Sequence, residues 1–294
     1  MKEKLHKVYK WSNSWTGTIV IVLFVIFFIA QAFRIPSGSM KDSLLIGDHL
    51  FAKKFAYGVP MPHIPFLEMS IMPWSDNLRL FDGATPERGD IVIFRPPHNT
   101  KQHFVKRCFA LPEDEVLFTD KNELYLRPHE GEKFIYDNYP KEKIVTLLGK
   151  LWVKSPMADI HHGIHNDDNH NIYEDYLQAY LYEHSAVNMI PVNIREISTK
   201  YNLPFNGFVT KVKEKNYYMI GDNRDHSNDS RFWGSVPYDN IEGTPWFIYF
   251  SVDNNWEIRW DRMGKTPTDL EESPYLDKAI EERKRTDKDY HGIT

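Results

Sequence analysis

The chain has a single cysteine, no excess of basic charge and only one long apolar run. Each of these features limits the class of protein to which the chain can belong. Its 294 residues include one cysteine, Cys108, so no disulfide can form within the chain. Acidic residues outnumber basic ones by 41 to 36, which leaves a net charge of −5. Nucleic-acid-binding domains carry a basic surface instead. We therefore expect a globular protein with a sizeable core and no nucleic-acid partner.

One segment near the N-terminus is apolar enough to cross a membrane. Residues 16–33 carry no charge, and as a helix they would extend roughly 27 Å, close to the ~30 Å of a bilayer's hydrocarbon core. The preceding residues 1–15 contain four lysines and one acid, which favours a cytoplasmic N-terminus. We expect a cytoplasmic segment 1–15, a single-pass anchor 16–33 in the cytoplasmic (inner) membrane, and a body on the extracytoplasmic, periplasmic face.

Two other interpretations of this segment are possible. A cleaved signal peptide is the first, because Ala30-Gln31-Ala32 is a small-x-small cleavage pattern after an apolar core. It would also export the rest of the chain, and it differs only in leaving the body untethered. A buried globular helix is the second, and the terminal position and the lysines before the run disfavour it.

The body after the apolar run has the pattern of a mainly β protein, with short strand-like runs separated by turns. Residues 91–94 and 103–111 are apolar enough to form buried strands. A hairpin is expected over 115–126, with its turn at Lys121-Asn122. The fold class is therefore mainly β, preceded by one N-terminal transmembrane helix.

The character of the sequence changes twice along this body. After residue 126 the periodicity weakens and polar residues become frequent. The strand pattern then resumes, and the final residues are charged and marked by proline, which predicts a solvated tail with a short helix near 281–285. The expected parts are a first core segment 34–126, an inserted subdomain 127–212, a second core segment 213–264 and a charged tail 265–294.

Three motifs follow one another and carry the candidate chemistry: Pro36-Ser37-Gly38-Ser39-Met40, Val105-Lys106-Arg107 and the polar loop 221–234. A serine hydroxyl attacks poorly at neutral pH unless a base takes its proton. Gly-x-Ser-x-Gly is absent, which argues against an α/β-hydrolase. The order of the motifs predicts a serine nucleophile just outside the membrane, a lysine that activates it and a loop that holds the lysine.

Lys106 is the candidate base because its neighbours in the strand are apolar. Alternation places its side chain on the same face as Phe104 and Cys108. Burial on that face would remove the hydration of the ammonium group and lower the pKa of the lysine, so that the amine could accept a proton. A strand lysine that reaches solvent is the alternative, and Ser39 upstream and the polar loop downstream disfavour it.

On these residues the chain resembles the bacterial type I signal peptidases, the leader peptidase family of Ser–Lys proteases. The resemblance covers about a third of the chain and is most specific in the loop 221–234. A calcium-binding loop is the alternative there, but Arg224 and Arg231 would repel a cation. The matching segments are Ile35-Pro36-Ser37-Gly38-Ser39-Met40, 44–48, 54–58, 88–94, Val105-Lys106-Arg107, Leu111-Pro112 and 221–234.

The resemblance implies a role for each matching residue. Ser39 would be the nucleophile and Lys106 the general base, and the Ser39 amide and the Ser37 hydroxyl would form the oxyanion hole. Ser227 would donate to or accept from the Lys106 amine and orient it. The other implied residues are a supporting ion pair, Asp229 with Arg231, and the walls of shallow substrate pockets, Ile35, Pro36, Met40 and Val105.

The resemblance also implies a function and a fold. The function is a membrane-anchored serine endopeptidase that removes signal peptides from exported preproteins, cutting after small-x-small sites. The fold is a coiled β-sheet catalytic core with an inserted smaller domain. Its partners would be preprotein signal peptides and the lipid bilayer, with no cofactor, metal or nucleic acid. The alternatives are a dedicated Ser–Lys protease for one pilus or conjugation substrate, or an inactive membrane-tethered scaffold.

Two features lie outside the family pattern. Where the family often has Gly-Leu-Pro-Gly-Asp, this chain has Ala110-Leu111-Pro112-Glu113-Asp114, so the geometry of that turn is not implied. His161, His162, His165 and His170 lie among aspartates and could bind a transition metal. A solvated loop is the favoured interpretation, because His-Glu-x-x-His is absent.

Overall fold

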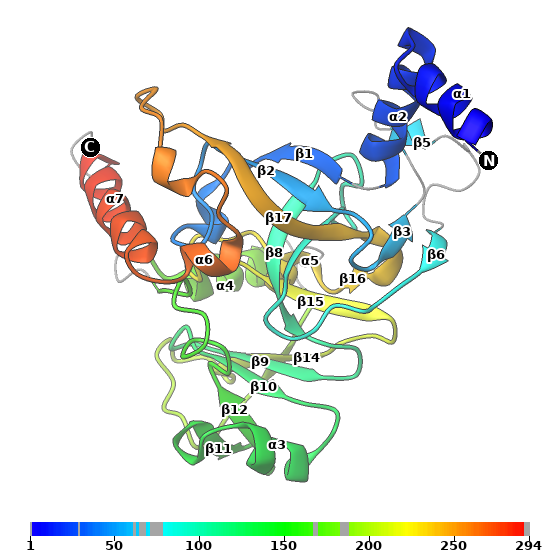
Figure 1. The fold of residues 1–294 in the computed structure, drawn as a ribbon. Helices are drawn as coiled ribbons and strands as arrows, with labels where there is room; N and C mark the ends of the chain where they lie inside the picture. Colours follow the sequence, from blue (N-terminus) through cyan, green and yellow to red (C-terminus); the bar gives the residue numbers. More distant parts are fainter. Residues whose placement is uncertain are drawn as a thin grey trace.

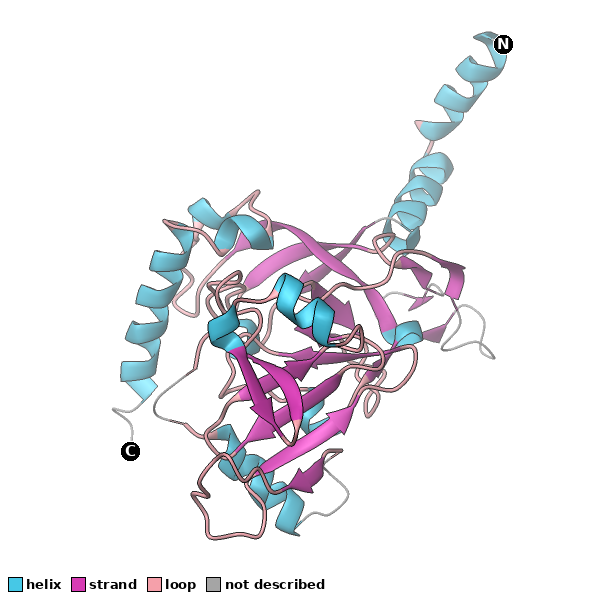
Figure 2. Cartoon of the chain, turned by 90° about the horizontal axis from the view of Figure 1, so that it is seen from below, coloured by secondary structure: helices cyan, strands magenta, loops and turns pink. Residues whose placement is uncertain are grey.

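Two antiparallel sheets form the body of the protein in the computed structural model (Figure 1). The structure describes residues 2–28, 30–60, 63–64, 69–70, 79–166, 170–182 and 188–290. Helices lie at the margins of the sheets, and the N-terminal pair projects away from them (Figure 2). The mainly β class expected from the sequence is confirmed.

The first sheet holds the strand that carries the candidate base. Its seven strands lie in the order β1-β2-β17-β7-β8-β15-β16. They are β1 (Ala30–Arg34), β2 (Asp48–Lys53), β17 (Ile241–Ser251), β7 (Ile91–Phe94), β8 (Phe104–Ala110), β15 (Asn216–Ile220) and β16 (Val236–Pro237). Ile91 and Ile93 pack in one core cluster, and Val92 and Phe94 pack in another. Both faces of β7 are therefore buried, which explains its uninterrupted apolar sequence.

The second sheet has six strands in the order β11-β12-β10-β9-β14-β13. They are β11 (Ile144–Leu147), β12 (Lys150–Lys154), β10 (Leu124–Arg127), β9 (Glu115–Thr119), β14 (Gly207–Lys211) and β13 (Ile190–Val192). The expected hairpin is confirmed, with Leu124 opposite Phe118 and a φ of 62° at Asn122 in its turn. Because β9 also pairs with β14, the hairpin belongs to this sheet, which begins before residue 127.

Short elements complete the described chain. Two small sheets pair β3 (Gly58–Pro60) with β6 (Arg79–Asp82) and β4 (His63–Ile64) with β5 (Met69–Ser70). The helices are α1 (Lys2–Ser12), α2 (Trp15–Phe28), α3 (Glu132–Asn138), α4 (Ile172–Tyr182), α5 (Ser230–Trp233), α6 (Pro267–Leu270) and α7 (Tyr275–Tyr290). Single 3₁₀ turns are η1 (Gly38–Met40), η2 (Lys141–Lys143), η3 (Tyr238–Asn240) and η4 (Trp260–Arg262).

The apolar N-terminal run is divided between a helix and a strand. Its helix, α2, has 14 residues and ends at Phe28, whereas Ala30–Arg34 forms β1 and pairs with β2. The helix is shorter than the anchor expected over 16–33 because the backbone of the last residues bonds to a neighbouring strand. Of the helices that the structure describes, none combines the length and the apolar character needed to span a bilayer.

The tail differs from the solvated segment expected from its charge. Leu270 is fully buried and packs in the cluster that contains Ile35 and Met40. Leu276 and Ala279 of α7 are also buried. Long helix α7 runs beside the first sheet at the far side from the N-terminal helices (Figure 1). A few apolar side chains spaced along a charged segment were enough to hold it on the core.

Candidate active site

Ser39 lies in the tight turn η1, which the polar loop 221–234 holds in place. The Asn223 amide donates to the Ser39 carbonyl oxygen at 3.2 Å, and Asn223 Nδ2 donates to the Gly38 carbonyl at 3.3 Å. A Cβ at Gly221 would lie 2.5 Å from the Ser39 carbonyl oxygen. Only glycine therefore permits the loop to approach the serine turn this closely.

Lys106 reaches the same point from β8. Its Nζ lies 2.5 Å from Ser39 Oγ and 3.3 Å from the Val105 carbonyl oxygen. Ser37 Oγ lies 3.4 Å from Ser39 Oγ. Both Ser39 and Lys106 are buried, with 8% and 4% of their surface exposed. The fold thus brings the first two motifs into hydrogen-bond contact in a site that largely excludes water.

The electrostatic surroundings of Lys106 favour its neutral form. Burial lowers the pKa of Lys106 from 10.5 to about 8, because the charged ammonium loses its hydration. Asp229 and Asp222 oppose this shift, and Arg231 reinforces it. Both hydrogen bonds of the lysine are to uncharged oxygens. The amine can therefore act as a proton acceptor near neutral pH.

Asp229 and Arg231 form a buried ion pair at the base of the loop. Arg231 Nη2 lies 2.8 Å from Asp229 Oδ2, and neither side chain is more than 1% exposed. Although burial opposes ionisation, Arg231 holds the pKa of Asp229 below its ordinary value. Asp229 also accepts from the Gly221 amide at 3.2 Å. The pair therefore fixes the loop at the glycine that contacts the serine turn.

Ser227 does not make the hydrogen bond to Lys106 that the resemblance implies. Its buried Oγ makes no hydrogen bond to Lys106, and it instead helps to lower the pKa of Asp229. A Cβ at Gly221 would lie 2.3 Å from this Oγ, so Ser227 is packed against the loop backbone. The Lys106 amine is directed instead to Ser39 Oγ and the Val105 carbonyl.

A cleft of about 890 Å³ opens over the Ser39–Lys106 pair. All four residues expected to form substrate pockets line it: Ile35, Pro36, Met40 and Val105. Ile35 and Met40 are almost fully buried and share a core cluster against which Val105 packs. Since these side chains are fixed by the core, the walls of the cleft are apolar and rigid.

Several residues line the cleft whose place there was not predicted from the sequence. They include Gln102, His103, His165, Asn223 and Arg283. Arg283 comes from α7, and its Nη1 lies 2.9 Å from Asp42 Oδ2. The capping box of Thr266 and Asp269 marks the start of the four-residue helix α6 and not of α7, so no local pattern points to Arg283.

The described histidines of the patch 159–171 do not converge on one point. Three of them have different carboxylate partners: Glu271 for His161, Asp42 for His165 and Asp175 for His170. The ring of His170 also stacks on that of His226, with 4.6 Å between centroids. Residues 167–169, which include two of the aspartates, lie outside the described residues.

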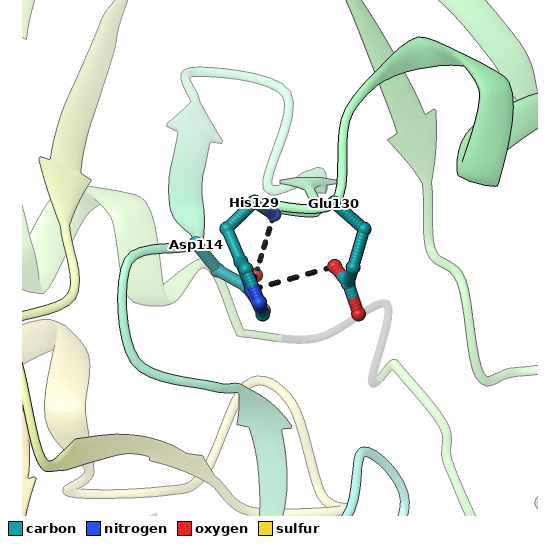
Figure 3. A group of neighbouring side chains, drawn as sticks. All are labelled: Asp114, His129 and Glu130. Atoms are coloured by element: carbon teal, nitrogen blue, oxygen red, sulfur yellow. Dashed lines mark hydrogen bonds and ion pairs between the residues drawn. The ribbon is translucent and has the colours of Figure 1, made fainter.

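One set of three potential metal ligands occurs among the described residues, and it lies elsewhere. Asp114, in the turn between β8 and β9, lies beside His129 and Glu130, which follow β10 (Figure 3). Arg88 Nη2 lies 2.7 Å from a carboxylate oxygen of both Asp114 and Glu130. Asp114 also accepts from the amides of Leu111 and His129. The guanidinium already neutralises both carboxylates, so we interpret the cluster as structural.

Replacing Asp114 by alanine is expected to lower the free energy of unfolding by about 3 to 5 kcal/mol, because it leaves Arg88 without a fully buried partner. Glu130 is 30% exposed, so Glu130→Gln should cost no more than about 1 kcal/mol. Urea denaturation of the two variants checks the difference. Equal losses for both variants would contradict the structural role given to Asp114.

With the geometry established, comparisons with known proteins identify the family. The model of the family described as "Signal peptidase, peptidase S26" matches residues 8–250. Signal peptidase I of Helicobacter pylori strain ATCC 700392 / 26695 is 43% identical over 285 residues, which cover 91% of this chain and 96% of the relative. Signal peptidase I of Buchnera aphidicola subsp. Baizongia pistaciae is 32% identical and covers 84% of this chain and 80% of the relative.

A solved signal peptidase I from Enterococcus faecalis V583 is 23% identical to the chain, with a TM-score of 0.27, and the match covers 55% of this chain and 97% of that one. The family model spans both the serine turn and the loop 221–234. The two relatives named above cover most of the chain at more than 30% identity. This chain therefore belongs to the signal peptidase family, peptidase S26.

Proposed function

We propose that this chain is a serine endopeptidase that removes signal peptides from exported preproteins, with Ser39 as nucleophile and Lys106 as general base. The observation that carries the proposal is the 2.5 Å contact between Lys106 Nζ and Ser39 Oγ in a buried cleft. The relatives described above are signal peptidases I, which supports the substrate class. An inactive scaffold is not favoured, because both reacting groups are present and in contact.

The reaction begins with proton transfer from Ser39 Oγ to the neutral amine of Lys106. The oxygen then attacks the scissile carbonyl carbon and forms a tetrahedral intermediate. Lys106, now an ammonium, returns the proton to the nitrogen of the leaving mature protein, and an ester between Ser39 and the signal peptide remains. Water activated by the regenerated amine hydrolyses this ester and frees Ser39.

The oxyanion of the intermediate needs donors beside the nucleophile. The Ser39 amide is in the turn η1, and Ser37 Oγ is 3.4 Å from Ser39 Oγ. These two groups are the proposed oxyanion hole. Because such donors bind the charge that develops only during the reaction, they lower the barrier more than they strengthen substrate binding.

Removing the Ser37 hydroxyl in Ser37→Ala should lower kcat roughly 10² to 10³ fold with little change in KM. Steady-state cleavage of a signal-peptide substrate measures both constants. Ser37→Thr keeps a hydroxyl at this position and serves as the matched control. A rise in KM at unchanged kcat would place Ser37 in ground-state binding instead.

The apolar cleft supports cleavage after small-x-small sites. Ile35, Pro36, Met40 and Val105 line the cleft that contains Ser39, and we propose that small substrate side chains pack against them. Apolar walls distinguish small from large substrate side chains by steric fit. An alanine side chain needs no polar partner in such a pocket.

The membrane placement is part of the same proposal. Apolar side chains along α2 are exposed, among them Ile19, Val20 and Phe24, each more than half accessible. Lysines precede this helix on α1. Together they support attachment of the body to the cytoplasmic membrane through α2, with a cytoplasmic N-terminus and a catalytic body on the opposite face.

Cleavage of purified preproteins in detergent tests the proposal. Several unrelated preproteins are incubated with the full chain, and mass spectrometry reads each new N-terminus. Cuts after small-x-small sites in most of them are expected. Cleavage of a single pilus or conjugation protein would favour the dedicated protease, and failure to cleave any of them would overturn the proposal.

A further inference from the structure

The C-terminal segment brings a buried carboxylate to the back of the active site. The family match ends at residue 250, and α6 and α7 lie beyond it. Glu271 follows α6 directly and is 6% exposed, whereas its neighbour Glu272 is exposed. A carboxylate that is removed from water needs charged or hydrogen-bonding partners to offset its lost hydration. The partners of Glu271 therefore indicate the role of the C-terminal segment.

Glu271 contacts three segments that are far apart in the sequence. Its Oε1 pairs with Arg107 Nη2 and lies 3.3 Å from Ser43 Oγ. Its Oε2 lies 2.9 Å from His161 Nδ1. Arg107 follows the candidate base Lys106 on β8, and Ser43 is four residues beyond Ser39. The Glu271 side chain thus contacts both β8, which carries Lys106, and the residues that follow the turn η1.

Arg107 is held from two sides, and Glu271 is one of them. Its Nε and Nη2 donate to Asp222 at 2.7 and 2.6 Å, and its Nη1 donates to the Gly89 carbonyl at 2.7 Å. Asp222 also accepts from Ser43 Oγ at 2.6 Å. Without Glu271 one face of the guanidinium would lose its partner, and the bidentate pair with Asp222 could shift along with it.

A second contact fixes the tail to the serine turn. Arg283 of α7 lies 2.9 Å from Asp42, which is three residues beyond Ser39. Asp42 has a φ of 79°, a conformation that its surroundings must enforce. Arg283 also lines the cleft over Ser39 and Lys106. The tail is therefore attached at two points, to Arg107 beside Lys106 and to the residues that follow Ser39.

From these contacts we infer that Glu271 is a positioning residue for the Ser39–Lys106 pair and that the segment 265–290 is a built-in brace of the active site. It acts through Arg107 and Asp222 and touches no reacting atom. Asp222 is one of the charges that act on Lys106. A shift of Asp222 would change both the position of Lys106 and the electrostatic potential at its amine. The inference rests on the proposed function, since it concerns the same two residues.

The test compares Glu271→Gln with the matched exposed control Glu272→Gln, both as full chains. Glu271→Gln should lower kcat about tenfold, equivalent to about 1.4 kcal/mol, with KM within about twofold of the parent value. Loss of a negative charge beside Arg107 makes the surroundings of Lys106 more positive, so the acid limb of the pH profile should move to lower pH. Glu272→Gln should match the parent in every measurement.

A direct titration of Lys106 separates this inference from the proposed function. Carbon NMR of lysine-labelled protein reports the Lys106 pKa whether or not a preprotein is cleaved. A lowered pKa in Glu271→Gln supports the brace even if the proposed substrate is wrong. An unchanged pKa together with an unchanged kcat overturns it, as does a loss of thermal stability alone.

The conservative change Glu271→Asp covers the case in which Glu271→Gln does not fold. It keeps the negative charge but shortens the reach toward Arg107. The Lys106 pKa should then stay near the parent value while kcat remains lowered, because the charge is present and the geometry is not. Parent-like kcat in Glu271→Asp would show that position does not matter and would overturn the inference.

Discussion

Ser39→Ala is expected to lower kcat/KM by roughly four to six orders of magnitude, because the oxygen proposed to attack the scissile carbonyl is removed. Its Oγ is held 2.5 Å from the amine of Lys106. The measurement is cleavage of a preprotein at matched enzyme concentrations, with products separated by mass.

The control for this prediction is Ser198→Ala. Ser198 is exposed in the second part of the chain, so its hydroxyl should contribute nothing to the reaction. Unfolding curves of both variants should lie within about 1 kcal/mol of the parent. Cleavage by Ser39→Ala within tenfold of the parent rate would rule out Ser39 as the nucleophile.

Lys106→Met is expected to lower kcat/KM by roughly 10³ to 10⁴ fold or more, because Ser39 loses its proposed general base. Methionine keeps the length and apolar volume of the lysine stem, so the cleft should keep its shape. In the parent protein kcat/KM should rise with pH through a value near 8, the pKa to which burial lowers Lys106. A profile that rises only near pH 10 would contradict this role.

The same substitution should stabilise the fold at neutral pH. The pKa of Lys106 is about 8 in the folded chain and 10.5 ordinarily, so between these values the unfolded state binds more protons. Stability therefore rises with pH across that window, and the full cost of about 3 kcal/mol is present below it. At pH 7, the free energy of unfolding of Lys106→Met should exceed that of the parent protein by about 2 to 3 kcal/mol. The difference should shrink above pH 8.

Lys121→Met is the matched surface control for both effects. Lys121 lies in the exposed turn between β9 and β10, where its ammonium stays hydrated. Its loss should leave the cleavage rate unchanged and shift stability by no more than about 0.5 kcal/mol. If Lys106→Met is less stable than the parent at pH 7, the amine is not desolvated in the way proposed.

The contrast between Lys106 and Glu271 shows which site residues sequence patterns can find. Lys106 sits in an apolar strand of regular alternation, so its burial and its face follow from local periodicity. Glu271 sits in a charged segment with only scattered apolar residues, and nothing nearby in the sequence distinguishes it from the exposed Glu272. Its burial depends on Arg107 and Ser43, which are more than a hundred residues away.

Ser227 shows a further limit of the resemblance. A matching motif placed this residue in the loop beside the reacting pair, but the hydrogen bond implied for it is not formed. A side-chain hydrogen bond depends on distances of a few tenths of an ångström. A matching motif predicts where a loop lies. It does not predict which oxygens the lysine amine contacts, because that depends on the exact positions of the nearest oxygens.

By itself the amino-acid sequence determined the mainly β class, the hairpin at Lys121-Asn122 and the serine and lysine motifs, because these depend on neighbours a few residues apart. Only the tertiary structure decided how far the apolar run is helical, which sheet takes the hairpin, and that the tail braces the active site. Those outcomes depend on backbone pairing and buried charge between distant segments, whose energies no local pattern contains.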